Sequence, residues 1–202
     1  MGKIMIVNGS PRAPKSNSRR YAEIFARHCK SECDYFNISR SNHDELCSKI
    51  SGYTDLLIVF PLYADSIPAT LLDFLKSMEA YHLENKPVIS ILVNCGFLEP
   101  EQNRTVIRMM KLFCDKNGFK TGSVLSLGSG EAILDTPFRS VASRLVRKLA
   151  NSISSGQYRD LQGTMPMTKK LFLWASTRYW SAYGKKNGIT PEAMRTMEIE
   201  GN

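Results

Sequence analysis

The alternation of short apolar runs with longer amphipathic segments constrains the fold of this chain more than any other feature. Four runs lack a polar residue at every second position and contain β-branched residues, which is typical of strands buried on both faces of a parallel sheet. They are "KIMIVN" (3–8), "DLLIVFP" (55–61), "PVISILVN" (87–94) and "SVLSLGS" (123–129). A weaker run, "DYFNIS" (34–39), lies between the first two.

The segments between these runs place apolar residues on one side of a helix. The helices predicted from this pattern cover residues 18–30, 68–81, 103–117 and 138–153. Pro68 stands at a helix start, where its missing N–H costs no hydrogen bond. Strand and helix thus alternate five times along the chain, which predicts an α/β fold with an open, doubly wound, five-stranded parallel sheet.

The composition changes near residues 156–168, which read as a linker or a long loop. We therefore expect a sheet domain over residues 1–157 and a C-terminal extension over residues 158–202 that belongs to the same unit. The stretch "KKLFLWASTRYWSAYGKKNG" contains both tryptophans and is predicted to be one amphipathic helix ended by Gly188. Packing on its own domain or on a second subunit is the favoured interpretation, and lying on a membrane surface is the alternative.

The formal net charge of the 202-residue chain is +8, which permits attraction to phosphates, nucleic acid or acidic membranes. The basic residues are scattered and no nucleic-acid-binding motif is present, so we do not expect nucleic-acid binding. No apolar run approaches the length of a membrane span. The apolar start of the chain is also too short for the core of a signal peptide, and we expect a cytoplasmic protein.

The chain contains five cysteines and no Cys-x-x-Cys pair, at positions 29, 33, 47, 95 and 114. Cys29 and Cys33 lie four residues apart, with His28 beside the first. Small free thiols in a reducing compartment are a better interpretation than a metal site, which needs several convergent ligands. The three histidines lie away from the predicted strand ends and are assigned a structural role.

The loop after the first strand, "GSPRAPKSNS" (9–18), has the composition of an anion site. In doubly wound sheets, ligands bind beyond the carboxyl ends of the strands, where the strand order reverses. Gly9 permits a sharp turn, Arg12 offers a fork of charged donors, and the helix that begins near Ser18 directs free N–H groups into the loop. Further short donors are Ser10, Ser16, Asn17 and Ser18. Together they predict a phosphate site, although neither a dinucleotide fingerprint nor a Walker A motif is present.

The loops after the strands at 55–61 and 87–94 present flat aromatic surfaces at the same edge. Tyr63 is suited to lie against a ring system, and a helix cap or a solvated carboxylate is favoured for Asp65 over a catalytic role. In "NCGFLEPEQN", Gly96 lets the backbone approach a ligand. Cys95 is predicted to line the pocket without a redox role, because no partner thiol or activating cation adjoins it in sequence.

The stretches "KIMIVNGSPRAPKSNS" and "VFPLYADSIPATLLDFL" resemble the flavodoxin-like NAD(P)H-dependent FMN reductases. "NCGFLEPEQN", "GSGEAI" and the tail "YGKKNGIT" are similar to a little-characterised bacterial subgroup of that family. The resemblance implies the strand order 2-1-3-4-5 and a homodimer with FMN near its interface. Many members have a Gly-Gly pair where this chain has Gly96-Phe97, and the cysteine cluster of the iron-sulfur flavoproteins is missing here.

The resemblance also implies a set of cofactor-binding residues. Those implied to hold the FMN phosphate are Ser10, Arg12, Ser16, Asn17 and Ser18. Those implied to run along the flavin ring are Pro61, Leu62, Tyr63, Ala64 and Asp65. Those implied to close the other polar edge of the ring are Asn94, Cys95, Gly96 and Phe97.

The function implied by the resemblance is that of an FMN-binding oxidoreductase with NAD(P)H as co-substrate. Electrons would pass from the nicotinamide through the flavin to a small acceptor such as a quinone, a free flavin or a nitro compound. Because the flavin carries the chemistry, no catalytic acid–base residue and no metal is expected. The alternative is a non-catalytic flavodoxin-like electron carrier or flavin-binding interaction module.

Overall fold

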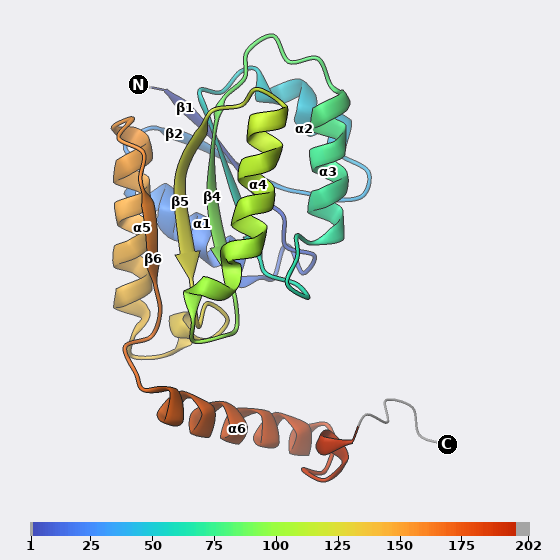
Figure 1. Ribbon diagram of the computed structural model, residues 1–202, viewed down its shortest axis with the longest axis vertical. Coiled ribbons are helices and arrows are strands. Elements are labelled where there is room, and N and C mark those ends of the chain that lie inside the picture. The colour runs from blue at the N-terminus through green and yellow to red at the C-terminus, as the bar shows by residue number, and fades with distance from the viewer. Residues whose placement is uncertain (1, 197–202) are drawn as a thin grey trace. The chain divides into compact units, whose positions relative to one another are not determined.

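The computed structural model describes residues 2–196 of the chain. It divides into two compact units, Met1–Met165 and Pro166–Asn202. The first unit contains a parallel β-sheet with helices on both faces, and the second contains a long helix. Figure 1 shows the elements of each unit, which are described separately below.

The sheet of the first unit has six strands in the order β2-β1-β3-β4-β5-β6, and all neighbours pair in parallel. The strands are β1 (Lys3–Asn8), β2 (Glu32–Asn37), β3 (Asp55–Pro61), β4 (Val88–Asn94), β5 (Thr121–Leu127) and β6 (Asp160–Gly163). The first five strands coincide with the runs predicted from sequence to within two residues. The apolar side chains of β1, β3, β4 and β5 are buried on both faces, which explains why these runs do not alternate with polar residues, whereas β2 is only half-buried.

The predicted number of five strands is wrong, because β6 adds a sixth at the edge of the sheet beside β5. It lies in the stretch that was predicted to be a linker or loop. Its four residues, "DLQG", include one large apolar side chain, Leu161, and none of the four is fully buried. Short polar edge strands resist pairing with other chains, and for the same reason they produce no hydrophobic run in the sequence.

Five helices cover the two faces of the sheet (Figure 1). They are α1 (Asn17–His28), α2 (His43–Ile50), α3 (Ala69–Ala80), α4 (Arg104–Lys116) and α5 (Arg139–Ser154). The helices α2, α3 and α4 bury their apolar side chains in one cluster with residues of β1, β3, β4 and β5, whereas α1 packs with α5. The helix α2 was not among the helices predicted, because its eight residues "HDELCSKI" are too few to show a clear period.

The register of the parallel strands places four strand ends at one edge of the sheet. Asn8 of β1 lies beside Val59, Pro61 of β3 beside Asn94, and Asn94 of β4 beside Leu127. The chain leaves β1 toward β2 on one side and later returns to its other side as β3, so the strand order reverses here. The loops after β1, β3, β4 and β5, with the short helices η1 (Pro100–Asn103) and η2 (Ile133–Asp135), therefore surround one region.

The second unit consists of α6 (Lys169–Lys186) and the short helix η3 (Ala193–Arg195). Thr168 caps the start of α6 by accepting a hydrogen bond from the N–H of Leu171 at 3.4 Å. The helix ends just before Gly188, whose φ of 74° is the left-handed conformation common at helix ends. Within residues 2–196, every helix is too short or too polar to reach across a bilayer.

We expect the substitution Leu71→Ala to lower the free energy of unfolding by about 2–5 kcal/mol, since it leaves a cavity in the core. Leu71 of α3 is fully buried, and its Cδ2 lies 2.9 Å from where a Cβ on Gly9 would be, so it also supports the loop after β1. Urea denaturation of purified protein measures the change.

The neighbouring substitution Leu72→Ala is the matched control, because Leu72 lies on the same helix with 39% of its surface exposed. It should change the free energy of unfolding by no more than about 0.5 kcal/mol. Equal losses for the two variants would contradict the assignment of Leu71 to the core.

Candidate functional site

A cavity of about 190 Å³ lies at the edge where the four strand ends meet. Its lining comes from the loops after β1, β3, β4 and β5. The lining residues are Ser10, Arg12, Ser16, Asn17, Ser18, Pro61, Leu62, Tyr63, Asn94, Cys95, Gly96 and Glu131. Of the residues predicted to bind the cofactor, all but Ala64, Asp65 and Phe97 are in this lining.

The loop after β1 is held in shape by Asn8, a buried residue that the sequence analysis did not identify. Its side-chain Oδ1 accepts a hydrogen bond from the N–H of Ser10 at 2.9 Å. Its Nδ2 donates to the hydroxyl of Ser16 at 3.2 Å and to that of Tyr35 at 2.9 Å. One amide thus joins the start of the loop to its end and to β2.

The helix α1 begins at the end of this loop, with Ser16 as its N-cap. The Ser16 hydroxyl accepts a hydrogen bond from the N–H of Arg19 at 3.2 Å, so it caps the helix and also lines the cavity. The N–H groups of the first turn that lack helical partners, together with the positive end of the helix dipole, favour an anion at this position. Ser10 and Arg12 lie in the same lining and add a hydroxyl and a guanidinium.

The loop after β3 makes a tight turn closed by two hydrogen bonds between Tyr63 and Ser66, of 3.2 Å and 2.8 Å. Ala64 and Asp65 form the tip, with φ of 44° and 56°, a conformation that is unfavourable for residues with a Cβ. Both residues are exposed and outside the cavity lining. The turn leaves Tyr63 43% exposed at the mouth of the cavity, where a flat ligand could lie against it.

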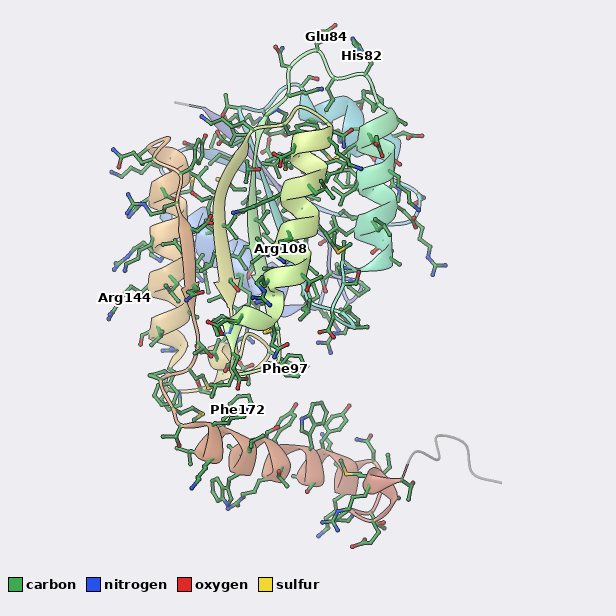
Figure 2. All side chains as sticks on the ribbon, in the orientation of Figure 1. His82, Glu84, Phe97, Arg108, Arg144 and Phe172 are labelled. Carbon is green, nitrogen blue, oxygen red and sulfur yellow. The ribbon has the colours of Figure 1, made fainter. Side chains whose placement is uncertain are left out.

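The end of β4 contributes Asn94, Cys95 and Gly96. The Asn94 side chain is buried and donates hydrogen bonds to the carbonyl of Phe60 at 3.1 Å and to the hydroxyl of Ser18 at 3.4 Å. Burial raises the pKa of the Cys95 thiol, which suits a lining residue better than a reactive thiolate. Phe97, labelled in Figure 2, is 51% exposed and outside the lining.

The loop after β5, which contains the stretch "GSGEAI", is the part of the site to which the sequence alone assigned no role. Gly130 packs so closely on β4 that a Cβ there would lie 2.5 Å from the Cβ of Asn94, and its N–H donates to the carbonyl of Cys95 at 2.7 Å. Its carbonyl accepts a 2.7 Å hydrogen bond from the buried Tyr21 hydroxyl of α1. Arg20 of α1 binds both carboxylate oxygens of Asp135, at 2.7 Å and 2.8 Å, and lowers the pKa of that carboxyl group.

This anchoring places Glu131 among the residues predicted to bind phosphate. Its carboxylate lies 3.4 Å from the guanidinium of Arg12, and its backbone carbonyl accepts a hydrogen bond from the Asn17 side chain at 2.6 Å. The positive charge of Arg12 is therefore balanced by a carboxylate of the same chain. Glu131 could have been found from sequence, because the loop after the fifth strand must end at the same edge as the three loops that were considered.

No family model matches this chain, and no curated protein matches its sequence. Solved structures do match the fold. An NAD(P)H:quinone oxidoreductase from Methanothermobacter marburgensis is 15% identical, with a TM-score of 0.61 over 75% of this chain and 96% of that chain. An FMN-dependent NADH-azoreductase from Bacillus anthracis, solved in complex with FMN, is 13% identical, with a TM-score of 0.59 over 76% of this chain and all of its own.

A flavodoxin from Streptococcus pneumoniae has a TM-score of 0.57 at 13% identity, over 76% of this chain and 99% of that chain. At such identities the similarity establishes the fold and nothing beyond it. The expected flavodoxin-like α/β fold is thus confirmed, with the first five strands in the flavodoxin order and β6 added. The roles of the lining residues stay predictions.

We expect Tyr21→Phe to lower the free energy of unfolding by about 1–3 kcal/mol, because it leaves the Gly130 carbonyl without its buried hydrogen-bond donor. Urea denaturation measures the loss. Tyr81→Phe is the control, since Tyr81 is 39% exposed at the end of α3 and should tolerate loss of its hydroxyl. Equal stability of Tyr21→Phe and the unaltered protein would show that α1 does not hold the loop after β5 in this way.

Proposed function

We propose that the protein binds FMN in the cavity at the carboxyl edge of the sheet and acts as an NAD(P)H-dependent flavin oxidoreductase. The observation that carries the proposal is the meeting of two different kinds of surface in one cavity. A hydroxyl-rich, basic helix start lies on one side, and the exposed ring of Tyr63 with the backbone of Gly96 lies on the other.

The residues present fit the two ends of FMN. Ser10, Arg12 and Asn17 offer neutral and charged donors for a phosphate, beside the free N–H groups of α1. Tyr63 offers a flat surface for the ring, and the backbone near Gly96 is open to a polar ring edge. We assign the implied phosphate, ring and ring-edge roles to the lining residues on this basis.

Bound FMN would supply the hydride and electron transfer, so the chain itself needs no acid–base residue. Its contribution is to hold the phosphate, to orient the ring and to limit access of water. The raised pKa of Cys95 is consistent with this, because the lining then presents a neutral thiol and no competing nucleophile. The described residues contain no cluster of His, Cys, Asp or Glu that could hold a metal ion.

The structural neighbours support a reductase more than a carrier. Their names include a quinone oxidoreductase and an azoreductase, both of which use a nicotinamide. By analogy we propose a small acceptor, of the quinone, flavin or nitro class, and a cytoplasmic homodimer. The flavodoxin neighbour favours the second candidate, an electron carrier or interaction module that exchanges electrons with a protein partner.

The deciding experiment is an absorbance titration of the purified protein with FMN, followed by anaerobic addition of NADPH or NADH. We expect flavin bands at one FMN per chain, bleaching by at least one nicotinamide, and re-oxidation by a quinone. Binding without bleaching, together with reduction by a reductase protein, would establish the carrier instead. No binding at millimolar FMN would refute both proposals.

The ion pair between Arg12 and Glu131 predicts opposite effects of the two side chains on FMN binding. Arg12→Ala should weaken it by about 1.5–3 kcal/mol, through loss of a charge-assisted hydrogen bond to phosphate. Glu131→Gln should tighten it about threefold or more, because it frees Arg12 and removes a negative charge from the phosphate site. Fluorescence titration measures both.

Riboflavin is the matched control ligand because it lacks the phosphate. Its affinity should change little in either variant. If Glu131→Gln weakened FMN and riboflavin equally, Glu131 would instead be an acceptor for the sugar hydroxyls, and its opposition to phosphate would be wrong.

A further inference from the structure

A second cavity, of about 690 Å³, lies away from the carboxyl edge of the sheet. Its walls are formed by Lys30, two residues past the end of α1, by the last two turns of α5 and by the entry to β6. The lining residues are Lys30, Lys148, Asn151, Ser152, Ser154, Ser155, Gln157, Arg159 and Leu161. Because α5 ends and β6 begins here, this cavity belongs to the end of the sheet where the strands start.

The lining contains three basic side chains and no acidic one. Lys30, Lys148 and Arg159 are all exposed, and none takes part in an ion pair within the described part of the chain. The other polar lining groups are hydroxyls and amides, which can donate hydrogen bonds to oxygen. A concave surface with unbalanced positive charge and neutral donors attracts small anions, carboxylates among them.

Two thiols adjoin this cavity. Cys29 is the C-cap of α1, and its Sγ lies 3.2 Å from the hydroxyl of Ser154, which is itself a lining residue. Cys33, the second residue of β2, interacts with Cys29 through its side chain, and both thiols are half-buried. The four-residue spacing noted in the sequence therefore brings two accessible thiols together beside a cationic surface.

The surroundings make the two thiols unequal. Contact with the Cys33 side chain and the hydrogen bond with the Ser154 hydroxyl lower the pKa of Cys29, and the contact with Cys29 raises the pKa of Cys33. These contacts act against burial, the negative end of α1 and the carboxylate of Asp55, which all favour the neutral thiol. Cys29 is hydrogen-bonded to a residue of the cavity lining, whereas burial raises the pKa of the remaining three thiols, so Cys29 is assigned as the nucleophile.

We propose that Cys29 and Cys33 form a dithiol site for exchange with small disulfides that carry carboxylate groups. The cationic cavity beside Ser154 is the surface that selects them. This site would operate independently of flavin binding.

The exchange needs no further oxidant, because the small disulfide itself accepts the two electrons. The Cys29 thiolate attacks one sulfur of the disulfide, a bond forms between Cys29 Sγ and that sulfur, and the other half leaves as a thiolate. Cys33 then loses its proton to solvent and attacks Cys29 Sγ, which releases the second half. The two protein thiols are oxidised to one disulfide, and the small disulfide is reduced to two thiols.

Trapping of the mixed disulfide tests the chemistry, with oxidised glutathione as the anionic probe. In the unaltered chain we expect mass spectrometry to show loss of two hydrogens and a peptide linking Cys29 to Cys33. In Cys33→Ser the reaction should stop at one glutathione adduct on Cys29. The buried-thiol variant Cys47→Ser should behave like the unaltered protein.

The charge selection has its own matched probe, the cationic disulfide cystamine. In a Cys33→Ser background, the double substitution Lys148→Gln and Arg159→Gln should slow adduct formation with glutathione about threefold or more, and leave the cystamine rate equal or higher. Both exposed substitutions should leave the unfolding midpoint unchanged. Adducts spread evenly over the other cysteines would overturn the dithiol site, and an unchanged ratio of the two rates would overturn the role of the cavity. Neither result depends on whether FMN binds.

Discussion

The parallel register of β1 with both of its neighbours is the constraint on which the candidate site depends. β1 pairs with β2 on one side and β3 on the other, so the strand order reverses at β1. The buried Asn8 ends β1 at this reversal and bonds to three neighbours that hold the following loop. A shift of register by one residue would turn Asn8 to the opposite face and dismantle the loop.

The walls of the cavity are held mainly by α1. The helix starts at the cavity and holds two loops. Its N-cap residue, Ser16, ends the loop after β1, while Arg20 and Tyr21 form hydrogen bonds with the loop after β5. The carboxylate that faces Arg12 is therefore positioned by neighbouring residues of the helix whose start would receive an anion. The start of α1 favours an anion, while side chains of the same helix hold the loop whose Glu131 carboxylate opposes one.

Most strands of the sheet and the loop after β1 could be predicted from the sequence, because apolar runs and loop composition are local properties. The runs at 3–8 and 55–61 were recognised from apolar content, and the loop at 9–18 from its hydroxyls and Arg12. β6 was missed because a polar edge strand has no hydrophobic signal. Glu131 was missed because only the loops after the strands ending at 8, 61 and 94 were searched, although β5 ends at the same edge. Cys29 and Cys33 were predicted only to be small free thiols, because nothing local in the sequence reveals the basic residues of α5 and of the entry to β6 beside them.

The length of the strands has a consequence for electron flow. Six or seven residues of extended chain separate the two edges of the sheet by roughly 20 Å. A flavin at one edge and a thiol pair at the other would be separated by a core of buried apolar side chains. Two redox couples on one chain could then rest at different potentials, and only a diffusing carrier would bring them into equilibrium.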